Sequence, residues 1–349
     1  MSAVIAINRI RCPVDLSDCA TVRQAACYKA CMIARSLLAC VLISATVIAS
    51  AVGGPAATGA DKGARASQEL GEWQALRQAA ESGDPAAQCL LGELYTAGSL
   101  LPQDYGQAVE WFRRAAAQGL AEGQFALGLM HRHGRGVRQD EGEAARWYRR
   151  AAEQGYAEAQ VNLGMLYEAG LGVRQDYLEA ARWYRKALEC GSAPIRGAAA
   201  VHLGVLYGDG LGVERDDAAA VEWFKQAAAA GEPTGQVNLA RMLAMGLGVA
   251  RNDIEAAAWL RRAADQGLAR AQFLLALFYR DGRGTVKDDV QAYKWLLLSG
   301  ALTPEDARWT ITAVLLELGE AMSPDAIAEA RRQAREWATA FDSRHEPPD

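Results

Sequence analysis

Residues 157–191 read AEAQVNLGMLYEAGLGVRQDYLEAARWYRKALECG, and this stretch decides the fold because the chain repeats it. Its first part places Leu163, Leu166 and Tyr167 at positions i, i+3 and i+4, the spacing of one face of an α-helix. The Gly-Leu-Gly-Val turn at 170–173 then ends this helix, because glycine readily adopts the positive φ that a helix stop needs. An aspartate that suits an N-cap follows the turn, so a second helix is predicted and the unit is a helix pair.

Tryptophan marks the same place in six successive units. The intervals between these tryptophans are 36, 36, 40, 36 and 36 residues, and a small residue in the middle of each first helix has the same intervals. The longer interval contains a four-residue insertion located within residues 192–197, which is predicted to be a loop because the phase is restored after it. This period indicates a helical-repeat array, in place of the two or three globular domains that 349 residues would suggest. The tryptophans are Trp111, Trp147, Trp183, Trp223, Trp259 and Trp295, the small residues are Gly92, Gly128, Gly164, Gly204, Ala240 and Ala276, and the N-cap candidates are Asp104, Asp140, Asp176, Asp216, Asn252 and Asp288.

The repeated small, aromatic and basic residues are interpreted as structural. Glycine inside a helix costs about 1 kcal/mol relative to alanine. Because only alanine replaces it, this site is predicted to lie where a neighbouring helix crosses closely. The Trp-Tyr and Trp-Phe pairs recur with the repeat, which favours core packing over a ligand site. Basic pairs such as Arg149-Arg150 lie late in the second helices and complement the helix macrodipole, so no nucleic-acid surface is indicated.

The recurring pattern Ala-x-x-Leu-Gly-x-x-Tyr, Gly-x-Gly-Val, Asp, Ala, Trp-Tyr and Ala-Ala-x-x-Gly resembles the Sel-one-like repeat, an α/α relative of the tetratricopeptide repeat. The resemblance covers residues 84–300 in six units. It implies an all-α fold, a right-handed superhelical α/α solenoid whose repeats have about 36 residues. It also implies a scaffold or adaptor that binds a protein or peptide partner. Most members of the family have no intrinsic catalytic activity.

Capping helices are expected at both ends of the array. Residues 67–83 end like the second helix of a repeat, so they are predicted to form an amino-terminal cap with its helix at 68–82. Residues 301–341 contain two capping residues that are each followed by proline, which predicts closing helices near 304–319 and 324–341. The segments 52–66 and 342–349 are interpreted as a linker and a tail.

Residues 1–51 are predicted to be a leader. The apolar run 37–52 is shorter than the roughly 20 residues that span a bilayer. It follows Arg35 and contains an Ala-x-Ala site at 49–51, as a secretory signal peptide does. A start at Met32 would give this signal ordinary proportions, and a periplasmic or secreted location follows. The alternative is an uncleaved inner-membrane anchor with the helical array facing the periplasm.

The mature chain is expected to be acidic and monomeric, without a disulfide. Removing residues 1–51 removes five basic and two acidic residues and lowers the net charge from −5 to −8, which excludes a general attraction to nucleic acid. Five of the seven cysteines also lie in the leader. Cys89 and Cys190 are expected to lie too far apart to pair, because a disulfide needs Cα atoms within about 7 Å.

The sequence predicts no catalytic residue, cofactor or metal. Some exported relatives have a cysteine pair in each repeat and are associated with β-lactam binding, but this chain departs from that pattern. It contains no Ser-x-x-Lys, Ser-Asp-Asn or Lys-Thr-Gly signature. His131 and His133 lack a third ligand nearby, and His202 is interpreted as structural. An enzyme acting on envelope material, such as a β-lactam hydrolase, and a membrane-tethered adaptor stay open as alternatives.

A stripe on the first helices is the candidate partner-binding surface. In each first helix the stripe consists of the residues three before, one after and four after the small residue. These three positions have the spacing i, i+4 and i+7, so they share one face of the helix. The last two of them vary in charge and size from repeat to repeat. By resemblance to tetratricopeptide repeats, this stripe lines the concave face. Either it forms a peptide groove with an apolar centre and three arginines, or its residues merely cover a solvent-facing concavity. The candidate partner-binding residues are Glu93, Leu129, Arg132, Met165, Glu168, Val205, Arg241, Leu277 and Arg280.

Overall fold

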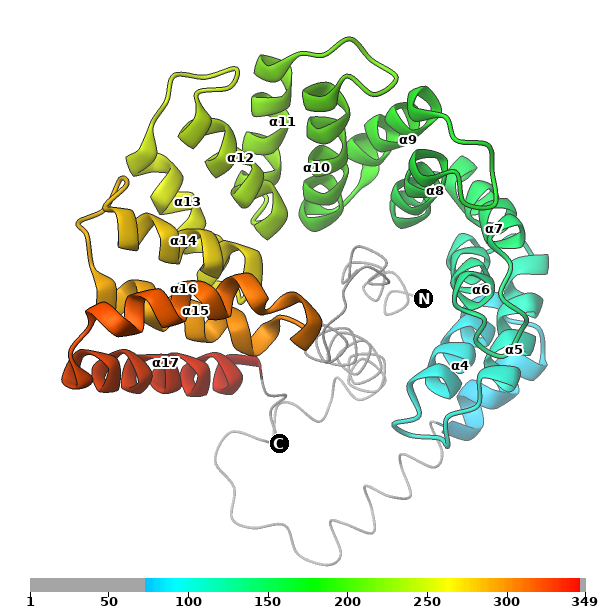
Figure 1. Cartoon of the computed structure of the whole chain (residues 1–349). Coiled ribbons are helices and arrows are strands. Elements are labelled where there is room, and N and C mark those ends of the chain that lie inside the picture. The colour runs from blue at the N-terminus through cyan, green and yellow to red at the C-terminus, as the bar shows by residue number, and fades with distance from the viewer. Residues whose placement is uncertain (1–72, 346–349) are drawn as a thin grey trace, which may run out of the picture. The chain divides into compact units, whose positions relative to one another are not determined.

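The structure is a computed structural model that describes residues 73–345 (Figure 1). Within that range every regular element is helical and no strand occurs, which confirms the all-α prediction. The described residues divide into two compact units, one ending at Asp176 and the other beginning at Tyr177. The third repeat contributes its first helix to one unit and its second helix to the other. The apolar run 37–52 and the beginning of the predicted amino-terminal cap lie outside the described residues.

The first unit is a run of antiparallel helices in which each helix packs on the next. It opens with a helix over residues 73–81, which lies within the predicted amino-terminal cap. Its further helices are α4 (Pro85–Ala97), α5 (Tyr105–Ala117), α6 (Ala121–His133), α7 (Glu141–Glu153) and α8 (Ala157–Ala169).

The second unit continues the alternation of first and second helices and ends in the closing helices. Within residues 73–345, no helix combines the length and the apolar character that crossing a bilayer requires. The elements of this unit are α9 (Tyr177–Cys190), α10 (Ala193–Asp209), α11 (Asp217–Ala229), α12 (Pro233–Met245), α13 (Asp253–Asp265), α14 (Ala269–Asp281), α15 (Asp289–Leu302), the 3-10 helix η2 (Glu305–Ala307), α16 (Trp309–Ala321) and α17 (Pro324–His345).

The predicted caps set the bounds of the helices. Asp140 accepts a hydrogen bond from the Glu143 backbone N–H at 2.9 Å, and Asn252 does the same for Glu255 at 3.1 Å. At the other end, Gly170 has φ +70° and ends α8. Gly172, two residues further on, has φ +65°, and a side chain on it would overlap the backbone of Glu141 at the start of α7. The Gly-x-Gly turns therefore stop the first helix and also pack on the preceding repeat.

The small residues allow the close helix crossing that the sequence predicts. A Cβ atom added to Gly92 would lie 2.6 Å from the ring of Phe112, and one added to Gly128 would lie 2.6 Å from the ring of Tyr148. Both aromatic side chains are almost completely buried. The first helix thus lies directly against the aromatic residue that follows the repeated tryptophan.

The prediction that the insertion forms a loop is wrong. Residues 193–197 lie inside α10, which has 17 residues where the other first helices have 13. Only Gly191 and Ser192 separate α9 from α10. Pro194 suits the first turn of a helix, and Ile195 is fully buried there. Because four residues make about one helical turn, the insertion lengthens α10 while leaving the later residues on their original face.

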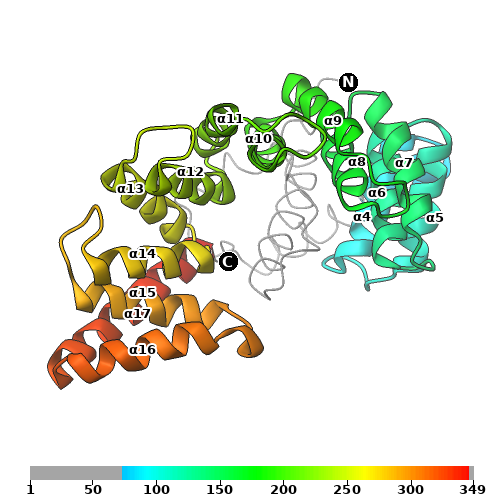
Figure 2. The same cartoon turned by 45° about the horizontal axis from the view of Figure 1, so that its top comes forward.

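The closing helices pack on α15, the second helix of the last repeat, and the first of them begins later than predicted (Figure 2). Pro304 is extended and precedes the 3-10 turn of η2, so α16 begins at Trp309. α17 does begin at Pro324, where Ser323 caps it by accepting from the Ala326 N–H at 3.2 Å. Trp337 of α17 meets Trp295 edge to face with ring centroids 5.7 Å apart.

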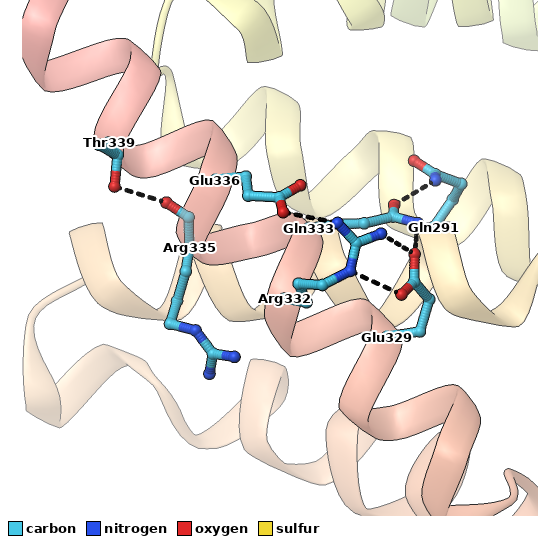
Figure 3. A network of polar contacts seen from close by, with 7 residues as sticks. All are labelled: Gln291, Glu329, Arg332, Gln333, Arg335, Glu336 and Thr339. Carbon is cyan, nitrogen blue, oxygen red and sulfur yellow. Dashed lines mark hydrogen bonds and ion pairs between the residues drawn. The ribbon is translucent and has the colours of Figure 1, made fainter.

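A polar network secures one side of α17 (Figure 3). Arg332 donates to Glu329 at 2.6 and 2.9 Å and to Glu336 at 2.5 Å. Gln291 of α15 joins it by donating to Gln333 at 2.8 Å. Hydrogen bonds from Arg332 and Gln333 hold the pKa of Glu329 at about 2. α17 therefore turns a charged, internally paired side to solvent.

Candidate interaction surface

The structure places the nine predicted partner-binding residues on first helices in both units. Glu93, Leu129, Arg132, Met165 and Glu168 belong to the first unit, and Val205, Arg241, Leu277 and Arg280 belong to the second. Seven of them are half-buried, whereas Arg241 is exposed and Arg132 is buried. The column three residues before the small position is buried at Cys89, Val161, Val201 and Val237 and half-buried at Phe125 and Phe273. The stripe thus runs from an inner apolar edge to partly exposed, variable side chains.

Arg132 departs from the expectation of an exposed groove cation. Only 7% of it is exposed, and its Nη1 donates to the Asn162 Oδ1 at 3.3 Å. The Asn162 amide in turn donates to the Glu158 carbonyl at 2.9 Å. The long side chain therefore reaches from α6 across to α8 and joins two repeats, because its partners come 30 residues later in the chain.

The other two arginines differ in their surroundings. Arg280 donates to Asp281 at 2.7 and 3.2 Å, and these bonds raise the pKa of Arg280, with Glu317 of α16 adding to the effect. Arg241 has no carboxylate within ion-pair distance among the residues that the structure describes. Arg241 is therefore the cation of the stripe that is most available to an acidic partner.

Sequence reasoning missed the bonds by which basic residues of the second helices join successive repeats. Arg149 donates to the Tyr167 hydroxyl at 2.6 Å, Arg185 donates to that of Tyr207 at 2.8 Å, and Arg261 donates to that of Tyr279. The signal was present as an arginine followed by a tyrosine 18 residues later, or 22 residues later across the insertion.

The second residue of each basic pair lies over the repeated tryptophan. The cation-to-centroid distances are 4.5 Å for Arg114 on Trp111, 4.5 Å for Arg150 on Trp147, 4.0 Å for Lys186 on Trp183 and 4.4 Å for Arg262 on Trp259. Each cation comes three residues after its tryptophan, on the same helix face. The basic pairs are therefore engaged within the repeats.

Glutamines join the two helices within a repeat. A glutamine near the end of each of three second helices donates to one in the preceding first helix, 30 residues earlier. The donor and acceptor pairs are Gln118 and Gln88 at 2.9 Å, Gln154 and Gln124 at 2.8 Å, and Gln266 and Gln236 at 3.0 Å. The acceptor amides are buried and the donor glutamines are exposed. These bonds position the two helices of the repeat and do not involve the stripe residues.

The histidines and cysteines are the candidate chemical groups of the chain. Among residues 73–345, no three His, Cys, Asp or Glu side chains are arranged to hold a metal ion. Burial lowers the pKa of His131, and Arg113 adds to that effect, while Glu143 and Asp140 oppose it. Cys89 is buried in the first unit, and Cys190 is exposed in the second. His202 stacks on Tyr184 with ring centroids 4.7 Å apart, consistent with its structural interpretation.

Comparison with known proteins identifies the repeat. The model of the Sel1 repeat matches residues 85–120, 121–156, 157–192, 197–232, 233–268 and 269–303. Among curated proteins, none matches this chain.

Solved structures that are similar to this chain include the following two. A protective antigen present in uropathogenic Escherichia coli strains, which displays an SLR fold, is 35% identical over 80% of this chain with a TM-score of 0.62. A Sel1 repeat protein from Oxalobacter formigenes is 33% identical over 64% of this chain with a TM-score of 0.59. The chain spans 57% of the length of the E. coli protein and 87% of that of the O. formigenes protein.

Proposed function

This chain belongs to the Sel1 (Sel-one-like) repeat family, whose helical arrays generally mediate protein–protein interaction, and we propose that it is an exported scaffold that binds a protein or peptide partner through its first helices. Members of the family are typically non-enzymatic, and binding in this chain requires no catalytic group. The proposed surface is the stripe around Val205, Arg241 and Leu277 in the second unit and around Leu129 and Met165 in the first.

The observation that carries this proposal is the contrast between fixed and variable positions within one chain. The glycine, tryptophan and glutamine positions recur and are engaged in packing or in bonds between the helices of a repeat. The stripe positions instead change between acidic, basic and apolar residues, and all nine stripe residues except the buried Arg132 are partly accessible. A surface that is free of structural duties in a repeated scaffold is the part that can specialise for a partner.

Export is proposed from the leader. The basic flank, the short apolar run 37–52 and the Ala-x-Ala site support a cleaved signal peptide. Mass spectrometry of the purified protein is expected to find an amino terminus near Val52. An intact apolar run would contradict cleavage and favour a membrane-tethered scaffold.

Site-specific crosslinking tests the binding surface. A photoreactive residue at position 205 or 277 is expected to capture a partner. The same photoreactive residue in place of the exposed Glu222, on the second helix α11, is expected not to capture it. Affinity for the captured partner is then measured for Arg241→Glu, with Arg182→Glu on α9 as the charge-matched control. We expect Arg241→Glu to weaken binding about tenfold or more and the control to leave it unchanged. Equal capture from positions 205 and 222, or equal affinity of the two variants, would rule this surface out.

A further inference from the structure

The closing helix α16 is apolar on both of its sides. Ile311 and Leu318 are buried on the side that packs toward α15. On the opposite side, Trp309 is 74% exposed and Leu316 is 65% exposed. A helix at the surface of a domain normally turns polar side chains to solvent. The outer side of α16 is an exception, because it exposes Trp309, one of the largest apolar side chains.

The exposed apolar residues form one stripe with an acidic edge. Trp309, Ala313 and Leu316 are exposed and have the spacing i, i+4 and i+7, which places them on a single helix face. Glu317 and Glu320 are also exposed and follow the stripe on the same side of the helix. α16 contains no lysine or arginine. We call these five residues the α16 outer face.

The position of α16 makes this stripe unusual for a repeat protein. Terminal helices of solenoids need a polar outer side, because no further repeat covers them. α17 satisfies this requirement through the paired charges of Glu329, Arg332 and Glu336 (Figure 3). The neighbouring helix α16 follows the last repeat and leaves Trp309 and Leu316 in contact with water. A stripe of this kind on a closing helix indicates a binding surface.

A second copy of the chain is a poor occupant of this face. One tryptophan, one leucine and one alanine offer much less than the roughly 800 Å² per partner that a stable dimer needs. Charge also opposes pairing of two α16 helices. An antiparallel pair would bring Glu317 and Glu320 toward Glu305 and Asp306 just before α16 of the other copy, and a parallel pair would bring like glutamates together.

The same charges favour a basic partner of modest size. We propose that the α16 outer face docks a short amphipathic helix of another protein. Its apolar side chains, spaced i, i+4 and i+7, cover Trp309, Ala313 and Leu316, and its flanking lysines or arginines meet Glu317 and Glu320. Glu317 also acts on Arg280 of the first-helix stripe, whereas Trp309, Ala313 and Leu316 belong to α16 alone.

A synthetic peptide pair tests the proposal with the whole chain. One 18-residue peptide of leucine and lysine carries its leucines along one helix face, and the other has the same composition with the leucines spread around the helix. Fluorescence anisotropy of the labelled peptides gives their affinities. The first peptide is expected to bind about tenfold more tightly than the second, since 1.4 kcal/mol corresponds to a factor of ten. Equal affinities would overturn the proposal, because they would indicate charge attraction alone.

Variants locate the binding. The double change Trp309→Ser/Leu316→Ser is expected to weaken the striped peptide about tenfold or more. The matched control is Ile254→Ser/Val286→Ser, which alters side chains that are 74% and 86% exposed elsewhere in the same unit and should leave the affinity unchanged. Glu317→Gln/Glu320→Gln is expected to weaken binding several-fold and to reduce its dependence on salt.

Two results would contradict the assignment. One is unchanged peptide affinity in the Trp309→Ser/Leu316→Ser variant. The other is a dimer of the unchanged chain in light scattering that becomes a monomer on Trp309→Ser, which would make a second copy the occupant.

Discussion

At the residue scale, the small residue of each first helix is smaller where the side chain that it faces is larger. Glycine accompanies an aromatic residue after the tryptophan in the first four repeats, and alanine accompanies leucine in the last two. The added Cβ contacts at Gly92 and Gly128 explain the match, because an alanine would press into the ring. The pairs are Gly92 and Phe112, Gly128 and Tyr148, Gly164 and Tyr184, Gly204 and Phe224, Ala240 and Leu260, and Ala276 and Leu296.

Gly128→Ala is therefore expected to destabilise the chain although alanine is the better helix former. Helix propensity alone would raise the free energy of unfolding by about 1 kcal/mol. Overpacking against Tyr148 is expected to outweigh this gain, so that the free energy of unfolding falls by about 1–3 kcal/mol. Urea unfolding of Gly128→Ala, Tyr148→Leu and the double variant forms a cycle. The double variant should have a higher free energy of unfolding than the sum of the two single effects predicts. Strict additivity of the two effects would contradict the packing argument.

His131 makes stability depend on pH. It stands where Tyr167 and Tyr207 stand in later repeats, and burial lowers its pKa below the ordinary value of about 6.5. A histidine with a lowered pKa in the folded state favours folding above the unfolded pKa, and this contribution is lost as the pH falls below it. Unfolding in urea should therefore need less denaturant at pH 5 than at pH 7.5.

His131→Tyr serves as the control for this effect. Tyrosine does not titrate between these two pH values, and at this position it can accept from Arg113 as Tyr167 accepts from Arg149. The variant should lose the part of the pH dependence that is due to His131. If His131→Tyr and the unchanged chain lose stability equally toward pH 5, the burial of His131 is not the cause.

At the scale of elements, the sequence predicted the helix pairs well because each boundary has a local chemical signal. The capping aspartates, the Gly-x-Gly turns and Pro324 all coincide with observed helix ends. The insertion was predicted to be a loop, and the structure instead places it in the first turn of α10. Its residues Ala-Pro-Ile-Arg suit either a turn or the first turn of a helix, and the burial of Ile195 by tertiary packing decides between them.

Deleting residues 193–196 tests this extra turn. Loss of the buried Ile195 should cost about 2 kcal/mol or more, while the residues after the deletion keep approximately their original face. Deleting only residues 194–195 should be more damaging, because it rotates the rest of α10 by about 200° relative to its first turn. Thermal unfolding followed by circular dichroism compares the two. Greater stability of the two-residue deletion would contradict a continuous helical turn.

At the scale of the whole molecule, the candidate surface was less predictable than the repeats. The spacing of Leu129, Met165 and Leu277 on first helices follows from periodicity alone, and the structure leaves them half-buried. The burial of Arg132 depends on a partner 30 residues away, which no local pattern indicates. The division of the third repeat between two units was also not predicted, because its sequence continues the period without a linker.

The substitution Trp337→Ala tests how far the loss of a closing contact is felt along the array. Stability in a solenoid is approximately a sum over neighbouring repeats, so loss of a closing contact should be felt close to it. Trp337 meets Trp295 at 5.7 Å and stacks on Phe341 at 4.9 Å, and both contacts lie at the end of the second unit. Hydrogen exchange is therefore expected to accelerate in α15, α16 and α17 and to stay unchanged in α4–α7. A uniform acceleration from α4 to α17 would mean that both units unfold together, and it would overturn the nearest-neighbour description of this chain.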